Sequence, residues 1–315
     1  MLSILEDDCS STPVATVLQE QTHKTDPVSV LLKSWRRRGK DAFTIHARWP
    51  AGHGFYAPRH GTHDPLLWCE TVRQVLPFLS HAAYRVPMGH QLLWRDFTWE
   101  LRAESLGADS APAAVDLHVT CEDVKYRKDR ASALTLSVEA ERDGRLLGRA
   151  RTGFTIQDRA VYERLRGPYA GVLSSDLHDR PLPAPADPAH VGRGDVKDVV
   201  LSPTGAPRTW ELRADTTHPY FFDHAVDHAP GMLLLEAARQ AACATAHPAP
   251  VVVLGMDTAF ARYAEFDAPC RLVADPLPTD ASGRRRVMVT AQQHARPVAS
   301  TTVTLAEAPV LRPAG

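Results

Sequence analysis

The chain has 315 residues, of which 44% are hydrophobic and 23% charged, so it can bury one large core or two of medium size. Its formal net charge of −1 argues against the basic surface that nucleic-acid binding requires. There is no signal-peptide pattern or membrane-spanning apolar run, and the five scattered cysteines show no metal-binding spacing. We therefore expect a cytoplasmic protein that binds neither nucleic acid, membrane nor metal and needs no cofactor.

The N-terminal half begins with little pattern and then alternates strongly. Residues 1–22 show no clear periodicity, so we expect a loose or variable arm there. Apolar content and alternation predict strands over 28–35 and 43–49. Four further segments, which follow a predicted helix, are also strand-like: 91–102, 114–121, 131–141 and 146–156. We place the first domain at 23–157.

The predicted helix of this first domain carries an unusual polar stripe. Asp64 is a good N-cap, and Pro65 fits the first helical position because its missing N–H needs no partner there. Glu70, Arg73 and Gln74 follow at spacings i, i+3 and i+4, so they share one face of the helix. Burying a carboxylate and a guanidinium is costly unless each has a partner. The stripe is therefore a candidate functional site.

A proline-rich segment separates the two halves of the sequence. Residues 158–190 include four prolines between 181 and 188 and predict an extended, semi-rigid linker. We place the second domain at 191–310. Its expected strands are 196–201, 209–213, 251–256, 270–274, 286–291 and 298–305.

The polar stripe recurs in the second half, 166 positions later (236 − 70), as Glu236, Arg239 and Gln240. Pro230 fits the first position of the helix that carries it. Both stripes follow a loop that is rich in histidine and aromatic residues, and the second loop spans 218–228. An internal repeat of this length predicts two copies of one domain.

These motifs resemble those of known enzymes. A histidine loop followed by Pro-Gly, four hydrophobic residues and E-A-x-x-Q resembles the central helix of hotdog-fold β-hydroxyacyl-carrier-protein dehydratases. The chain as a whole looks more like the A-factor biosynthesis (AfsA-type) hotdog family. The segments that carry this likeness are 23–32, 43–50, 63–74, 84–91 and 222–242. The resemblance implies an α+β fold, a tandem double hotdog in which each long central helix is wrapped by an antiparallel β-sheet.

The resemblance also implies an activity. Proteins of this family are understood to join a β-ketoacyl group, carried as a thioester on an acyl carrier protein, to the hydroxyl of dihydroxyacetone phosphate. The resulting ester leads to a γ-butyrolactone signal that controls secondary metabolism. Such an acyltransferase needs a base for the hydroxyl, a site for the developing oxyanion and a cation for the phosphate.

Residues of the second stripe and its loop are our first candidates for these roles. We expect Glu236 or His224 to act as the base. The amide of Gly231, at a helix N-terminus, can donate to the oxyanion. Arg239 can clamp the phosphate, because its planar fork donates two hydrogen bonds.

The first stripe and several neighbours complete the set of candidates. Glu70 and Arg73 either build the same catalytic site in the first domain or form a decayed copy of it. The remaining candidates for substrate binding are Tyr220, Asp227, His228, Gln74 and Gln240.

Each candidate also has a purely structural alternative. Glu236 and Arg239 can form an internal ion pair that fixes the helix. Asp227 and His228 can cap the helix or pair with each other. Tyr220 can form a wall of the pocket without reacting.

Two other classes of function remain open. One is a hotdog dehydratase or thioesterase that acts on acyl thioesters. The H-F-P segment of the dehydratase loop is absent at His224, which counts against this class. The other is a non-catalytic regulator that senses an acyl ligand. No DNA-binding domain is visible and both stripes are intact, which counts against the regulator.

Overall fold

One antiparallel sheet of thirteen strands forms the framework of the protein, in the order β1-β2-β3-β5-β6-β7-β4-β10-β13-β12-β11-β9-β8. The computed structural model describes residues 13–308. Its three α-helices are α1 (Pro65–Ala82), α2 (Arg159–Arg166) and α3 (Gly231–Ala246). The strands of the N-terminal half are β1 (Ala15–Thr16), β2 (Leu32–Arg37), β3 (Ala42–Trp49), β4 (Gln91–Leu101), β5 (Ala113–Arg127), β6 (Arg130–Arg142) and β7 (Arg145–Gln157). Those of the C-terminal half are β8 (Leu201–Pro203), β9 (Thr209–Leu212), β10 (Val251–Phe260), β11 (Arg271–Leu277), β12 (Arg285–Gln293) and β13 (Arg296–Glu307).

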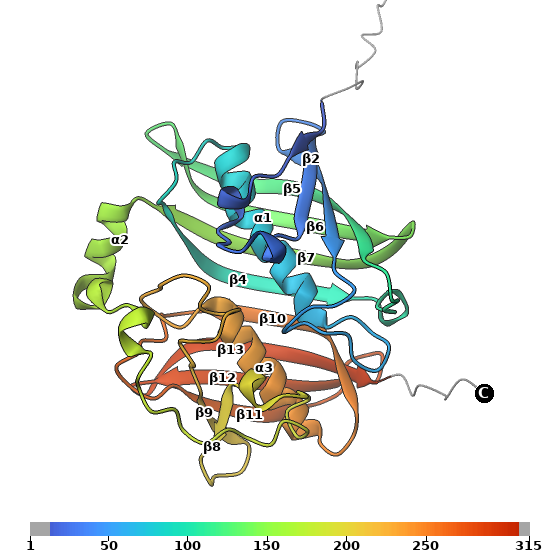
Figure 1. Ribbon diagram of the computed structural model, residues 1–315, viewed down its shortest axis with the longest axis vertical. Helices are drawn as coiled ribbons and strands as arrows, with labels where there is room; N and C mark the ends of the chain where they lie inside the picture. The colour runs from blue at the N-terminus through green and yellow to red at the C-terminus, as the bar shows by residue number, and fades with distance from the viewer. Residues whose placement is uncertain (1–12, 309–315) are drawn as a thin grey trace, which may run out of the picture.

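The two halves repeat one topology and join edge to edge. In each half, a pair of strands (β2 and β3, or β8 and β9) precedes a long helix and four strands follow it, as the sequence predicts; the short strand β1 is an addition in the first half. The strands β4 and β10 pair at the centre of the sheet, with Glu100 opposite Gly255 and Asp96 opposite Ala259. Figure 1 shows α1 and α3 on the same face of the sheet, one over each half. The expected α+β fold, with two helices wrapped by antiparallel sheet, is confirmed.

The two long helices begin differently. As predicted, Asp64 caps α1, accepting a hydrogen bond from the Leu66 amide at 2.9 Å, and Pro65 is the first helical residue. In α3, however, Pro230 is the N-cap, with extended backbone (φ −61°, ψ 149°), and the helix begins at Gly231. The prediction that Pro230 opens the helix was therefore wrong by one residue. A proline side chain accepts no hydrogen bond, so α3 has no side-chain cap.

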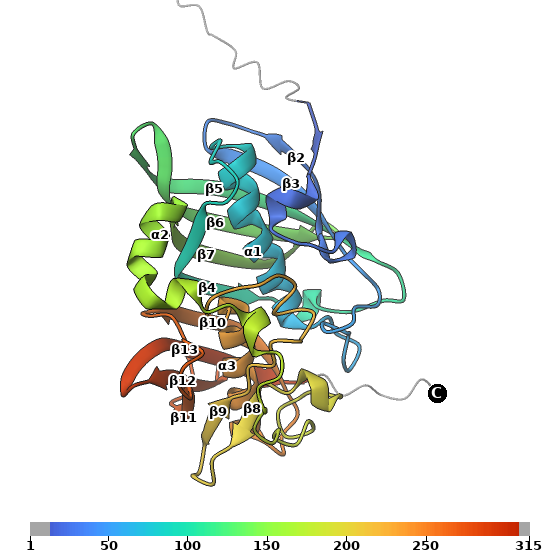
Figure 2. The same ribbon diagram turned by 60° about the vertical axis from the view of Figure 1, so that its left-hand side comes forward.

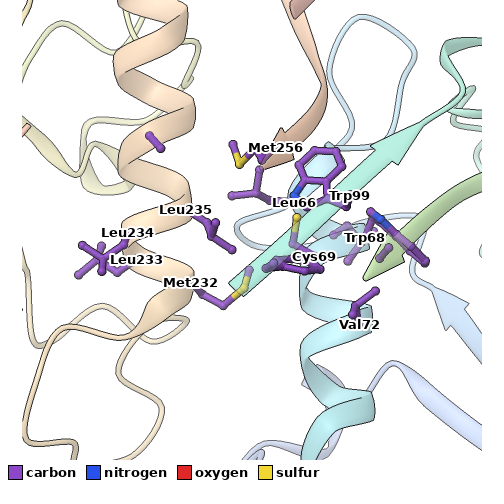
Figure 3. Packing of buried hydrophobic residues seen from close by; sticks show 14 of the residues in the cluster. Leu66, Trp68, Cys69, Val72, Trp99, Met232, Leu233, Leu234, Leu235 and Met256 are labelled. Carbon is purple, nitrogen blue, oxygen red and sulfur yellow. The ribbon is translucent and has the colours of Figure 1, made fainter. Parts of the chain in front are cut away.

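The core fills the space between each helix and the sheet and continues between the two helices. Leu66 and Cys69 of α1 face Met232 and Leu235 of α3, and Met256 from β10 closes the same space (Figure 3). All five side chains are buried. Each such aliphatic side chain contributes roughly 1.5–3 kcal/mol to folding, so this shared core holds the two halves together.

The segment expected to be an extended linker contains regular structure. It includes α2, whose N-cap Asp158 accepts a hydrogen bond from the Val161 amide at 2.9 Å. Tyr162 and Arg166 of α2 are buried, so tertiary contacts stabilise a helix that is too short to be stable alone. Figures 1 and 2 show α2 at one side of the molecule, from where the chain passes to the second half. The domain limits at 157 and 191 stay our proposal.

Most strand predictions are confirmed, but three segments differ. The strand expected at 28–35 begins only at Leu32, after a 3-10 turn over Pro27–Ser29. Residues 196–198 form a 3-10 turn, and the strand expected at 196–201 begins only at Leu201. Within the expected N-terminal arm, residues 1–12 lie outside the described part of the chain, whereas Ala15–Thr16 pairs with β2. Within residues 13–308, no helix is long and apolar enough to cross a membrane.

Candidate active site between the two halves

A cavity of about 420 Å³ opens between the first helix and the loop that precedes the third. Glu70 and Arg73 of α1 line one side of it, together with Lys24 from the segment before β2. The loop 220–231 lines the opposite side, so the cavity combines the polar stripe of one half with the histidine loop of the other. Apolar side chains complete the wall: Leu76, Leu92, Trp94, Met232, Leu234 and Phe260.

The stripe of α1 forms a closely hydrogen-bonded cluster at this cavity. Both Nε and Nη2 of Arg73 donate to the Glu70 carboxylate at 2.9 Å, and Nε2 of Gln74 donates to it at the same distance. Lys24 Nζ lies 3.6 Å from Glu70 Oε1. Burial opposes ionisation of Glu70, but Arg73 and Lys24 outweigh it and lower the pKa of this carboxyl to about 2. Glu70 is therefore ionised and a weak base at neutral pH.

The stripe of α3 is sealed in the protein interior. Glu236 is fully buried and accepts hydrogen bonds from Arg239 at 2.7 and 2.9 Å and from Gln240 at 2.6 Å. Arg193 adds a second fork, at 2.6 and 2.7 Å. Burial again opposes ionisation, but the two arginines lower the pKa of Glu236 to about 2. Neither Glu236, Arg239 nor Gln240 lines the cavity.

Sequence reasoning missed the cations Lys24 and Arg193, which occupy equivalent positions in the two halves, 169 residues apart (193 − 24). Each precedes an aspartate-capped 3-10 turn, Pro27–Ser29 in the first half and Val196–Asp198 in the second. The shared pattern, a basic residue two positions before the capping aspartate, was a signal in the sequence. It was hidden because its offset differs by three residues from that of the helices.

The two glutamines have one structural role in both halves. Gln74 accepts a hydrogen bond from the Leu31 amide at 2.9 Å and donates to the Ser29 carbonyl at 2.9 Å. Gln240 makes the matching bonds with the Val200 amide at 3.0 Å and the Asp198 carbonyl at 2.8 Å. Each glutamine therefore ties the segment before the sheet to its helix. Neither lines the cavity, although both were candidates for substrate binding.

Arg193 explains why the second stripe is closed. Its Nη1 donates to Asp64 Oδ2 at 2.9 Å and to the Phe55 carbonyl at 3.1 Å, both in the first half. Its guanidinium also lies 4.2 Å from the centre of the Phe55 ring. The space that corresponds to the cavity is thus filled by a guanidinium and an aromatic ring.

Two histidine–aspartate pairs face the cavity from the loop before α3. Nδ1 of His224 lies 2.7 Å from Asp223, and Nδ1 of His228 lies 2.7 Å from Asp227. The side chain of His224 is 49% exposed and that of His228 is 27% exposed. Both histidines line the cavity, whereas Asp227 lies behind it, buried. Imidazole is the side chain best suited to move a proton at neutral pH.

Tyr220 and Gly231 shape the cavity at either end of this loop. Tyr220 lines it, and its hydroxyl contacts Nε2 of His53. Gly231 packs against Trp94, because a Cβ atom built at this glycine would lie only 2.7 Å from Trp94 Cε3. In the described part of the chain, the amides of Gly231 and Met232 have no hydrogen-bond acceptor. These amides at the N-terminus of α3 can stabilise a negative charge at the cavity wall.

Comparison with known proteins identifies relatives of this chain. A family model described as the A-factor biosynthesis hotdog domain matches residues 7–158 and 175–307. The chain is 42% identical over 279 residues to a 2-oxo-3-(phosphooxy)propyl 3-oxoalkanoate synthase from Streptomyces virginiae, covering 89% of this chain and 94% of that protein. It is 40% identical to a synthase of the same name from Streptomyces coelicolor, covering 92% and 91%.

A solved structure supports the fold alone. It is the crystal structure of a Lactobacillus plantarum protein provisionally named an oleoyl thioesterase, which superimposes with a TM-score of 0.52 at 9% identity. The similarity covers 85% of this chain and 96% of that one. With the doubled stripe, the tandem fold and the extent of the family match, the chain belongs to the A-factor biosynthesis hotdog family.

Proposed function

We propose that the protein is an acyltransferase that joins a 3-oxoacyl group to dihydroxyacetone phosphate. The observation that carries the proposal is the similarity to synthases whose product, a 2-oxo-3-(phosphooxy)propyl 3-oxoalkanoate, is an ester of this kind. The similarity extends over more than 90% of each of these synthases, and the residue ranges that the family model matches include every residue that lines the cavity. The ester would serve as the precursor of a γ-butyrolactone-type signal that controls secondary metabolism.

The chemistry requires attack of a hydroxyl oxygen on a thioester carbonyl carbon. A new C–O bond forms, the hydroxyl proton passes to a base, and the C–S bond breaks to release a thiolate. The negative charge of the tetrahedral intermediate develops on the former carbonyl oxygen. We place this oxygen at the amides of Gly231 and Met232, because aligned donors in a cavity stabilise such a charge strongly.

The phosphate of the acceptor would bind the cations of the first stripe. Arg73 keeps 21% of its side chain exposed at the cavity, whereas Arg239 keeps 8% and faces the interior. Nη1 of Arg73 has no hydrogen-bond acceptor among residues 13–308, so it can donate to a phosphate oxygen. Lys24, which also lines the cavity, would add a second positive charge.

The stripe of α3 would then stabilise the fold and take no part in the reaction. Glu236 is held by two arginines and a glutamine, is fully buried and has no access to the cavity. We therefore propose Arg73 as the phosphate clamp in place of Arg239. We propose a histidine of the loop as the base in place of Glu236.

The 3-oxoacyl chain would lie along the apolar wall formed by Leu92, Trp94 and Phe260. We propose that it arrives as a thioester of an acyl carrier protein, whose flexible arm delivers the carbonyl to the N-terminus of α3. The reaction would take place in the cytoplasm, a compartment of which scattered unpaired cysteines are typical.

Mass spectrometry tests the function directly. Purified protein is incubated with a 3-oxoacyl thioester and carbon-13-labelled dihydroxyacetone phosphate. A new phosphorylated ester, or a butenolide phosphate formed from it, that carries the label is the expected result. Free 3-oxo acid with unchanged dihydroxyacetone phosphate would overturn the proposal and indicate a thioesterase. A dehydrated thioester formed from a 3-hydroxyacyl substrate would indicate a dehydratase, and acyl binding without turnover a ligand sensor.

A further inference from the structure

We propose that α2, in the segment between the two halves, positions the catalytic base: Tyr162 and Arg166 hold Asp227, and Asp227 orients His228 toward the cavity. This inference rests on the proposed acyl transfer and names the base that it requires. It makes His228 a catalytic residue, while Tyr162, Arg166 and Asp227 are positioning residues.

The geometry around Asp227 carries the inference. Its Oδ1 lies 2.7 Å from Nδ1 of His228 and accepts a hydrogen bond from the Tyr162 hydroxyl at 2.7 Å. Its Oδ2 accepts from Nε of Arg166 at 2.9 Å. Nη2 of the same arginine also donates to the Asp227 carbonyl at 2.8 Å. Three donors from two elements thus fix a buried carboxylate that does not itself line the cavity but is paired with His228, which does.

Arg166 is itself fixed from the second half. Its Nη1 and Nη2 donate to the two oxygens of Glu265, both at 2.6 Å, and its guanidinium lies 4.0 Å from the centre of the Tyr263 ring. Its side chain is 1% exposed. A buried arginine that bridges two carboxylates has little freedom to move. The position of α2 therefore fixes the position of Asp227.

The pair determines which nitrogen of His228 can act as a base. Because the ionised Asp227 accepts a hydrogen bond from Nδ1, this nitrogen carries the proton and Nε2 keeps its lone pair. In the described residues, Nε2 has no hydrogen-bond partner, and the ring lines the cavity. Among the described residues, Asp227 and Tyr263 contact this ring. Tyr162 and Arg166 are linked to it through Asp227, and Glu265 is linked through Arg166.

The proton then follows a balanced course. Nε2 of His228 takes the proton of the acceptor hydroxyl as its oxygen bonds to the thioester carbon. When the C–S bond breaks, the imidazolium returns this proton to the leaving thiolate. Asp227 stays ionised throughout and stabilises the imidazolium. Burial opposes ionisation of Asp227, but the donors His228, Tyr162 and Arg166 outweigh it and hold its pKa below the usual value.

The loop contains a second Asp-His pair, Asp223 and His224, four residues before Asp227 and His228, but its surroundings differ. His224 is half exposed, and Asp223 is held by Lys24 at 3.3 Å and by no group of α2. The base must be shielded from competing water, and the less exposed His228 meets this requirement better than His224. Exchange of His228 for asparagine is therefore expected to reduce transfer by about 100-fold or more.

The test is a Tyr162→Phe variant, which removes one hydroxyl and keeps the packing of the ring. Loss of a donor to Asp227 leaves more negative charge beside the His228 imidazolium. The acid limb of the kcat profile is therefore expected to move to higher pH. We also expect kcat at neutral pH to fall by roughly three- to tenfold, with KM for dihydroxyacetone phosphate unchanged. Arg166→Met is expected to shift the same limb in the same direction and further.

Matched controls separate this role from simple stability. Arg159 lies on the same helix but its side chain is 82% exposed, and among residues 13–308 it pairs only with Glu163. Arg159→Met is expected to keep the wild-type pH profile and kcat. A Tyr162→Phe variant with a lower melting temperature but an unchanged profile and kcat would overturn the inference. Absence of ester formation by the wild type would instead overturn the proposed function, so the two failures are distinguishable.

Discussion

Arg193 Nη1 lies 2.9 Å from Oδ2 of Asp64, the residue that caps α1 in the other half of the protein. The same arginine donates two hydrogen bonds to Glu236 of α3. Its counterpart Lys24 lies 3.6 Å from Glu70 and leaves that stripe open to the cavity. The two copies of the stripe thus differ: the stripe of α3 is sealed by an arginine that joins the halves, and the stripe of α1 is open to the cavity.

Removal of Arg193 is expected to destabilise the fold. Arg193→Met would leave Asp64 without its charged partner and Glu236 with a single arginine, and both carboxylates are buried. Breaking a buried ion pair in this way costs about 3–5 kcal/mol. Urea denaturation measures this free energy of unfolding. Lys197→Met, which removes an exposed partner of Asp195, is the control and should change it by less than about 0.5 kcal/mol. Equal effects of the two exchanges would contradict the sealed site.

Arg73 is expected to govern binding of the phosphorylated acceptor. Arg73→Met removes a charged donor from the cavity and should raise KM for dihydroxyacetone phosphate by roughly 10- to 100-fold, with a smaller effect on KM for the acyl thioester. Steady-state kinetics with each substrate varied in turn provide the measurement. Arg149→Met, at an exposed surface pair with Glu139, serves as the control. An unchanged acceptor KM would place the phosphate elsewhere.

Gly231 is expected to tolerate no side chain while Trp94 is present. The Cβ atom of Gly231→Ala would lie 2.7 Å from Trp94 Cε3, so the start of α3 or the indole must shift. A displacement of about 1 Å at the proposed oxyanion donors can cost roughly 100-fold in rate. A double-mutant cycle with Trp94→Leu measures the coupling, and the second exchange should restore part of the lost activity. Strictly additive losses would show that the contact does not matter.

Stability is expected to fall in acid. The pKa values of Glu70 and Glu236 in the folded protein are about 2, below the usual 4.5. Their stabilising contribution is therefore complete above about pH 4.5 and is lost as the pH falls toward 2. The free energy of unfolding, measured by urea titration between pH 6 and pH 3, should decrease through this window. Glu236→Gln should be less stable at pH 6 and show a shallower decrease, and a parallel curve would contradict the assignment.

The sequence predicted the parts of the fold that local chemistry specifies. Asp64 and Pro65 mark a helix start through capping and a fixed φ angle, and apolar content and alternation identified most of the strands in outline. The spacing of Glu70 and Arg73 predicted a shared helix face, and its repetition predicted the tandem halves. These signals depend on neighbours in the chain, so one sequence contains them.

The features that escaped prediction depend on contacts between distant residues. Nothing near Glu236 indicates that Arg193 seals it, since the arginine lies 43 positions earlier in an irregular segment. Likewise, α2 is stabilised by the contact of Arg166 with Glu265, across 99 positions. The sequence therefore indicated that two stripes exist, but not which of them faces a cavity.

We propose that each chain has one working site, at the stripe of α1. Native mass spectrometry of the protein with a saturating, non-hydrolysable 3-oxoacyl-pantetheine analogue counts the occupied sites. One analogue per chain is expected, with occupancy lost in Gly231→Leu, whose side chain would project toward Trp94 at the cavity wall. Two analogues per chain, or one that still binds when Gly231 is replaced, would contradict this account.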